Sequence, residues 1–396
     1  MMTDRSDQPS LARMLIVVAL LWLIGNALRL TILAVPPALP SIHDDLHLSA
    51  TQVGLLTGLP PMLLGLAAVP GSLLIARLGV LPALIVGLVL AAIGGALRGV
   101  YPHIALLYGM TIVTGAGVAI MQVTMPTVVR LWMPKRIGFA TAIYTNALVI
   151  GEIIPVSLTI PVILPWVGSW QWSFAVWSAP VIVIAVLVWA FAPRVQQPAS
   201  TLAAARRWWP DWNDSLIWKL GLMLGAVNAS YFGCNAFLPD YLTHTGQVEW
   251  ISPALTALNV GQLPASLLLL GAASRLERAT WPYLFAGLGI IAALFFVVFG
   301  RGLVVVAAAS VIGFFCALIL ILALALPPLL AAPEDVHRVS AAMFTISYSC
   351  AIIIPVICGA VWDFTGIPRS TFVPMGIMCV VLIVLAPSVT HVGRRT

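Results

Sequence analysis

The feature that most constrains this chain is a series of long apolar runs, each separated from the next by a short polar break. A helix of about 20 apolar residues matches the thickness of the hydrocarbon layer of a membrane. Since no water reaches the backbone there, a spanning segment must satisfy its own main-chain hydrogen bonds, as a helix does. We therefore expect an all-α membrane protein.

Charge is too scarce for a water-soluble fold. The 396 residues include 19 Lys or Arg and 13 Asp or Glu, so 8% are charged while 61% are hydrophobic. A soluble domain carries about 25% charged residues. The net charge of +6 does not indicate a nucleic-acid partner, because the basic residues are scattered singly between apolar runs instead of clustering on one face.

Twelve apolar segments are long enough to span a bilayer. The loops between them are too short to hold a soluble domain. The predicted helices are 11–35, 51–76, 81–97, 103–133, 138–166, 170–192, 215–241, 250–274, 281–299, 303–330, 339–362 and 370–389.

Short patterns recur in the chain at an interval of about 200 residues. Because they keep the same offset and order, they indicate two six-helix halves in parallel repeat, the architecture of major facilitator transporters. We expect a first bundle at 1–195, a linker at the inner membrane interface at 196–214 and a second bundle at 215–396. The matching pairs are Ile153-Ile154-Pro155 with Ile353-Ile354-Pro355, Arg98-Gly99 with Arg301-Gly302, and Leu39-Pro40 with Leu238-Pro239.

The basic residues lie mostly on one side of the predicted helices. With the N-terminus inside, fifteen Lys or Arg face the cytoplasm, and only Arg98, Arg301 and Arg369 face outward. Cytoplasmic loops of membrane proteins carry such an excess. We therefore expect a multi-pass protein of a prokaryotic inner membrane with both termini in the cytoplasm.

The chain lacks the motifs of ATP-driven or catalytic chemistry. Neither of its two lysines belongs to a P-loop, and no Ser–His–Asp or Cys–His set can be assembled inside the membrane. We expect no enzymatic activity and no cofactor. The spacing of His43, Asp44, Asp45 and His47 could suit a metal ion, but a solvated loop is the simpler interpretation, and we expect no metal site.

Two charged residues lie deep inside predicted spans. Arg29 is about 17 residues into the first helix and Glu152 about 15 into the fifth, which places both about 20–25 Å from the inner face. A charge there costs at least a few kcal/mol, so such residues usually face a cavity and carry function. A structural ion pair that holds two helices of one half together is the alternative, and the two interpretations are compatible.

Arg29 is suited to bind an anion, because its planar guanidinium stays charged when buried. Other polar and aromatic side chains share helix faces at spacings of three or four residues. For any one of them, hydrogen bonding between helices is the alternative. The candidate substrate residues are Trp22, Asn26, Arg29, Tyr144, Asn228, Tyr231, Asn235, Asn259, Gln262 and Tyr348, with Glu152 as the candidate proton carrier.

Several runs in the first half carry a family resemblance. They include Arg29 with the Val35-Pro36-Pro37 that follows it, Arg98-Gly99, Met125-Pro126 and Trp170-Gln171-Trp172. At these positions the chain resembles the cyanate permease and 2-nitroimidazole transporter family of the major facilitator superfamily. The second half resembles that family more loosely.

The resemblance implies a secondary transporter of a small solute that works as a monomer, with Arg29 matching the family's first-helix arginine. The chain departs from the family pattern at Ala27, where asparagine is usual, and at Glu152, where glycine or alanine is usual. Glu152 therefore points to a coupling or substrate choice that the family does not supply.

We expect a small-organic-anion transporter that works by alternating access and is coupled to protons. Glu152 would stay ionised while it pairs with Arg29, and would bind a proton when the substrate anion binds Arg29 in its place. One alternative is an exporter of a drug-like neutral or cationic compound, with Glu152 as its counter-charge. A further alternative is a non-transporting membrane sensor. The substrate and the direction of transport stay open.

Overall fold

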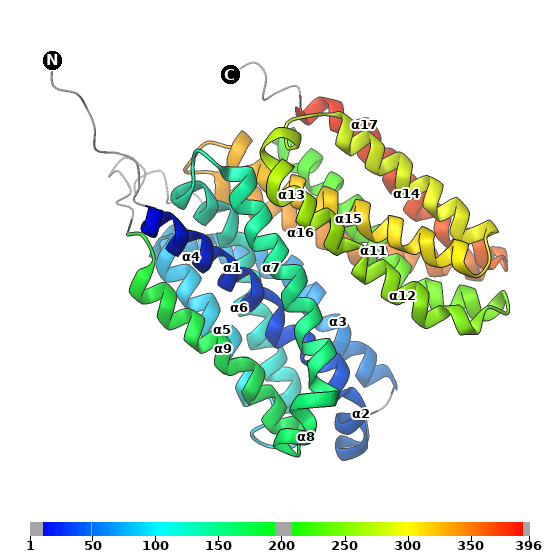
Figure 1. The fold of residues 1–396 in the computed structure, drawn as a ribbon, viewed down its shortest axis with the longest axis horizontal. Helices are drawn as coiled ribbons and strands as arrows, with labels where there is room; N and C mark the ends of the chain where they lie inside the picture. Colours follow the sequence, from blue (N-terminus) through cyan, green and yellow to red (C-terminus); the bar gives the residue numbers. More distant parts are fainter. Residues whose placement is uncertain (1–10, 49, 195–207, 391–396) are drawn as a thin grey trace.

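The structure is a computed structural model that describes residues 11–48, 50–194 and 208–390, without the side chains of 40, 43, 44, 50, 51, 53–55, 57, 58 and 390. Within those ranges the chain consists of helices and short turns, and no strand occurs. The helices form two bundles, shown in blue to green and in green to red in Figure 1.

The first bundle contains the helices from α1 to α9. They are α1 (Leu11–Leu33), α2 (Val35–Leu46), α3 (Ala50–Leu66), α4 (Ala68–Leu78), α5 (Val80–Leu97), α6 (Ile104–Trp132), α7 (Ile137–Leu158), the π-helical turn η1 (Thr159–Ile163), α8 (Leu164–Val167) and α9 (Trp170–Phe191).

The second bundle contains the helices from α11 to α17. They are α11 (Ser215–His244), η2 (Val248–Trp250), α12 (Ile251–Val260), α13 (Gln262–Leu276), α14 (Trp281–Phe299), α15 (Leu303–Leu330), α16 (Val336–Thr365), η3 (Pro368–Phe372) and α17 (Val373–Thr390).

The predicted all-α membrane protein is confirmed, although the count of spans is not. Among the described residues, ten helices are long and apolar enough to cross a bilayer, or eleven if the bent pair α3–α4 is one span. Helix α11 is long enough but more polar, because it carries Lys219, Asp240 and two asparagines. Twelve spans therefore remain a prediction. So do the bundle boundaries and the linker at 196–214, of which residues 196–207 lie outside the described chain.

Proline and glycine interrupt three of the spans. Helices α3 and α4 meet at an angle of 50° at Ala67, three residues before Pro70. Helix α7 passes into a π-helical turn that contains Pro161, and Gly261 separates α12 from α13. A proline lacks the N–H that the helix needs and crowds the preceding turn, which accounts for the interruptions beside Pro70 and Pro161.

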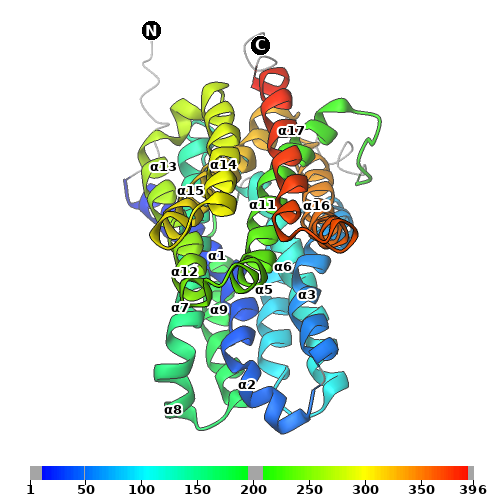
Figure 2. The same ribbon diagram turned by 90° about the vertical axis from the view of Figure 1, so that its right-hand side faces the viewer.

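The two bundles meet at one end and diverge toward the other (Figure 1). We call the end with the first turn of α1 and the last turn of α17 the terminal face. The opposite end, where α2 and α8 lie (Figure 2), is the far face. Contacts between the bundles join α3, α4, α6 and α7 to α13, α15 and α16, whereas α2, α8 and α12 pack mainly within their own bundles.

Hydrogen bonds join the bundles from the terminal face to the middle of the protein. Arg130 at the end of α6 donates to the carbonyls of Pro328 and Ala331, both at 2.6 Å. Nearer the middle, Asn146 donates to Ser266 at 2.9 Å. The bundles are therefore closed on the terminal face.

Arg98 lies inside the first bundle, although the pattern of basic residues predicts it at the outer water face. Its side chain is 1% exposed. It donates to the carbonyl of Thr31 at 2.9 Å, and its Cζ lies 5.7 Å from the centre of the Phe174 ring. Since it caps α5 and bonds near the end of α1, two helix C-termini supply negative potential to it. Burial lowers the pKa of Arg98 to about 9, so it stays charged at neutral pH. Its repeat partner Arg301 is exposed.

Glu277 lies at the contact between the bundles on the terminal face. Its side chain is 6% exposed, and a Cβ placed on Gly138, the second residue of α7, would lie only 2.0 Å from its Oε2. Glycine at position 138 therefore allows the carboxyl group of one bundle to approach the first turn of a helix in the other. Burial raises the pKa of Glu277 to about 7.

We predict that Glu277 makes stability depend on pH. Because the pKa in the folded protein is raised, the protonated form is favoured, and its contribution is lost as pH rises from about 4.5 to about 7. The melting temperature should be higher at about pH 5 than at about pH 8, and Glu277→Gln should shrink this difference. Thermal unfolding in detergent measures it, with the exposed Glu249→Gln as the control. An unchanged difference in Glu277→Gln would contradict the prediction.

Candidate functional site

An ion pair between α1 and α7 forms the centre of the candidate site. Arg29 donates from Nε to Oε1 of Glu152 at 2.9 Å, and the two side chains are 12% and 23% exposed. The helices approach closely because a Cβ on Gly25 would lie 2.2 Å from the carbonyl oxygen of Tyr144, and one on Gly151 would lie 2.7 Å from that of Asn26. The two deep charges that the sequence singled out are therefore in contact.

A side chain of the second bundle also reaches Arg29. Tyr348 on α16 lies beside the guanidinium, and its ring stacks on Phe344 with centroids 6.3 Å apart. The helix of Tyr348 is held to the first bundle by Thr345, which donates to the carbonyl of Gly65 at 3.0 Å. Arg29 thus bonds an acid of its own bundle and lies beside a phenol of the other.

Four of the predicted polar residues form one network in the second bundle. Tyr231 donates to Asn259 at 2.5 Å, and Gln262 lies beside Tyr231. Asn259 in turn donates to Asn235 at 3.4 Å. Tyr231 also interacts electrostatically with Glu152 and Arg29, so the network lies next to the ion pair and spans α11, α12 and α13.

Other predicted residues lie nearby but have different partners. Asn26 donates to the main-chain carbonyl of Trp22 at 3.1 Å, and Trp22 is half-buried. Asn228 donates to Ser347 at 2.8 Å and so links α11 to α16. Tyr144 is buried against α1 and lies near Tyr348. Asn26 therefore bonds within its own helix and Asn228 bonds to a neighbouring helix, as in the alternative interpretation of the polar residues.

The hydrogen bond between Asn146 and Ser266 closes the protein on the terminal side of the ion pair. Asn146 lies six residues before Glu152 on α7, or about 9 Å nearer the terminal face. Its side chain points to α13 of the other bundle, away from the direction of Glu152. The sequence analysis did not count Asn146 among the candidate site residues. The only signal for it was an asparagine on the face of α7 opposite to Glu152.

The charges of the site suit an anion better than a metal ion. Glu152 accepts a hydrogen bond from the Nε of Arg29. The terminal N–H groups of the guanidinium can therefore hold an oxyanion in a fork. Within the described ranges no group of three or more His, Cys, Asp or Glu side chains could hold a metal. The side chains of His43 and Asp44 lie outside the described residues.

Sequence comparisons give a family and several relatives. The family model for the Major Facilitator Superfamily matches residues 21–355. The cyanate transport protein CynX of Escherichia coli (strain K12) is 28% identical over 267 residues, which are 65% of this chain and 67% of the relative. A 2-nitroimidazole transporter of the same organism is 27% identical over 236 residues, 59% of each chain. The matches thus span three fifths to two thirds of these relatives.

Solved structures show the same fold at low sequence identity. The transporter FucP in its outward conformation has a TM-score of 0.73 at 16% identity, and the match covers 94% of this chain and 98% of FucP. The proton:xylose symporter XylE has a TM-score of 0.75 at 13% identity, with 94% and 95% covered. These likenesses confirm the predicted major facilitator fold of two helical bundles.

We predict that Arg29 and Glu152 stabilise the protein as a pair. Removing one partner leaves a buried charge unpaired, so Arg29→Ala and Glu152→Ala should each lower the free energy of unfolding by about 3 kcal/mol. The double variant should lose less than the sum, with a coupling of about 1–3 kcal/mol. Chemical unfolding in mixed micelles gives the three values, and the exposed Arg301→Ala is the control. Losses that simply add would show that the pair does not couple.

Proposed function

We propose, since this chain belongs to the Major Facilitator Superfamily, that it carries a small organic anion by alternating access of its two bundles and couples this transport to protons. Family membership makes the protein a multi-pass membrane transporter and not an enzyme. The substrate class, the coupling and the role of Arg29 are the proposal.

The contact of Arg29 with both bundles is the observation that carries the proposal. Its guanidinium bonds Glu152 of the first bundle at 2.9 Å and lies beside Tyr348 of the second. An anion that binds Arg29 therefore competes with one contact inside a bundle and one between the bundles, so that substrate binding changes the forces that hold the bundles together.

Glu152 supplies the proposed coupling to protons. While it accepts from Arg29, the opposite charge keeps it ionised. A substrate anion that takes the guanidinium removes this compensation, and a carboxylate that is only 23% exposed then takes up a proton in preference to remaining charged without a partner. The anion and the proton would cross the membrane together as a symport.

The network of the second bundle completes the proposed site. Tyr231, Asn259 and Gln262 offer neutral donors and acceptors next to the ion pair. Neutral groups can orient a bound solute without adding charge that would have to be compensated in the membrane. Asn228 would act indirectly, because its amide links α11 to α16, and the amide of Asn26 is engaged within α1.

The proposed orientation places the terminal face in the cytoplasm. Most Lys and Arg residues lie in the loops predicted on that side, as positively charged loops do in the cytoplasm. With this orientation the bundles are closed toward the cytoplasm and diverge toward the outside of an inner membrane. We propose that a single chain suffices for transport, as the family resemblance implies.

One observation favours a second candidate function, the export of a neutral or cationic compound. Glu152 is more exposed than Arg29, at 23% against 12%, so the acid can also present its charge to a solute. A relative named for 2-nitroimidazole is compatible with this candidate. Competition for binding by cations alone, lost in Glu152→Gln, would favour it over anion transport.

We predict that the two charges have separable effects on transport. Arg29→Ala should lower saturable uptake of anionic probes at least about tenfold, because a charge-assisted hydrogen bond is lost. Glu152→Gln should retain anion binding but lose the pH dependence of uptake, because it cannot bind the proton. Purified protein in proteoliposomes, with cyanate, formate and acetate as probes, measures both effects.

Arg301→Ala, which removes an exposed arginine, is the control and should behave as the wild type. If both site variants drive uptake with an unaltered pH dependence, the proposed mechanism is wrong. Measurable uptake of any probe by the wild type excludes the non-transporting sensor.

A further inference from the structure

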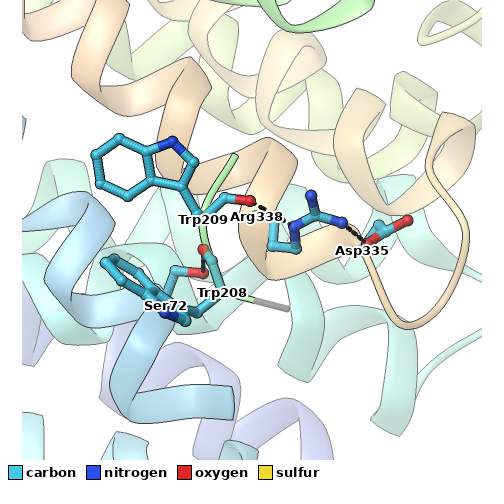
Figure 3. A network of polar contacts seen from close by, with 5 residues as sticks. All are labelled: Ser72, Trp208, Trp209, Asp335 and Arg338. Atoms are coloured by element: carbon cyan, nitrogen blue, oxygen red, sulfur yellow. Dashed lines mark hydrogen bonds and ion pairs between the residues drawn. The ribbon is translucent and has the colours of Figure 1, made fainter. Parts of the chain in front are cut away.

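A short piece of main chain lies between the two bundles on the terminal face. Trp208 and Trp209, which we call the strap, come just before α11, and each offers its carbonyl oxygen to a different bundle (Figure 3). Ser72 on α4 donates to the carbonyl of Trp208 at 2.9 Å. Arg338 on α16 donates from Nε to the carbonyl of Trp209 at 2.9 Å. The strap thus joins two helices that also pack against each other.

Several interactions attach the strap to the second bundle. The Arg338 bond is charge-assisted, and the same guanidinium pairs with Asp335, so its position is fixed from two sides. The ring of Trp209 also packs against Trp212, with centroids 6.4 Å apart. Trp212 accepts from the indole of Trp218 on α11 at 2.8 Å. The strap is therefore an extension of the second bundle.

A weaker attachment joins the strap to the first bundle. The hydroxyl of Ser72 is neutral, and its side chain is 0% exposed. A neutral hydrogen bond contributes about half as much as one to a charged group. When the terminal face opens, α4 and α16 must move apart and the strap cannot follow both. The Ser72 bond is then the one that breaks.

We propose that the strap is a latch that holds the terminal face closed and releases Ser72 when that face opens. It acts on the movement of the bundles that transport requires, and does not depend on which solute is carried or on proton coupling. Each turnover would break and remake one hydrogen bond at this point. The latch thus sets the fraction of protein molecules whose terminal face is open at rest.

The latch predicts that Ser72→Ala increases the terminal-face-open population about fivefold, the worth of one neutral hydrogen bond. Spin labels on cysteines at Leu78 and Ala332, exposed positions of the two bundles on that face, report it as a longer distance. The wild type taken through the same labelling corrects for the native cysteines. Ser178→Ala is the matched control, because Ser178 is also buried and also donates to a main-chain carbonyl, but within α9.

A double-mutant cycle tests whether the strap acts as one unit. If the bond from Arg338 positions the strap so that Ser72 can bond to it, Ser72→Ala should increase the open population less in an Arg338→Gln background than in the wild type. Equal populations in Ser72→Ala and Ser178→Ala overturn the proposal, as do effects of Ser72→Ala and Arg338→Gln that simply add. If Ser72→Ala does not fold, Ser72→Cys, which keeps a weaker donor, should give a smaller shift in the same direction, and no shift overturns the proposal.

Discussion

The cost of a charge away from water is the constraint on which the arrangement of this protein depends. Each charged group that leaves water must find compensation in its surroundings. Arg29 finds it in Glu152, and Arg98 finds it in the carbonyl of Thr31 near the end of α1 and in the C-terminus of α5, which it caps. Arg130 and Arg338 bind main-chain carbonyls of the other bundle or of the strap. The guanidinium groups therefore lie where the structure is joined together, and one of them lies where it is proposed to bind its solute.

Close approach of helices decides which of these pairs can form. Arg29 and Glu152 are on helices whose backbones nearly touch at Gly25 and Gly151. A larger residue at either position would push α1 and α7 apart. The ion pair thus depends on the close packing at these two glycines, since neither side chain could reach its partner across a wider gap. Small residues have this use in many membrane helices.

The sequence predicted the features that depend on one helix alone. It did not predict the contacts that depend on how several helices pack together. The apolar runs predicted the helices, and the depth of Arg29 and Glu152 predicted two charges at one level, which the structure joins. The burial of Arg98 escaped prediction because a position just past a span reads as a loop, and only the packing of α1 and α9 around it excludes water. The partners of Asn228 and Asn146 depend on how neighbouring helices are rotated, which periodicity along one chain does not report.

Most of the hydrogen bonds that join the two bundles end on main-chain oxygen atoms. The acceptors are the carbonyls of Gly65, Pro328, Ala331 and Trp208. An acceptor of this kind is present whatever side chain the residue carries, so only the donor must keep its identity. Mutational robustness is therefore unequal across the interface. One partner of each contact can vary widely in evolution without breaking the bond, while the few donors Arg130, Thr345 and Ser72 are the positions where substitution is costly.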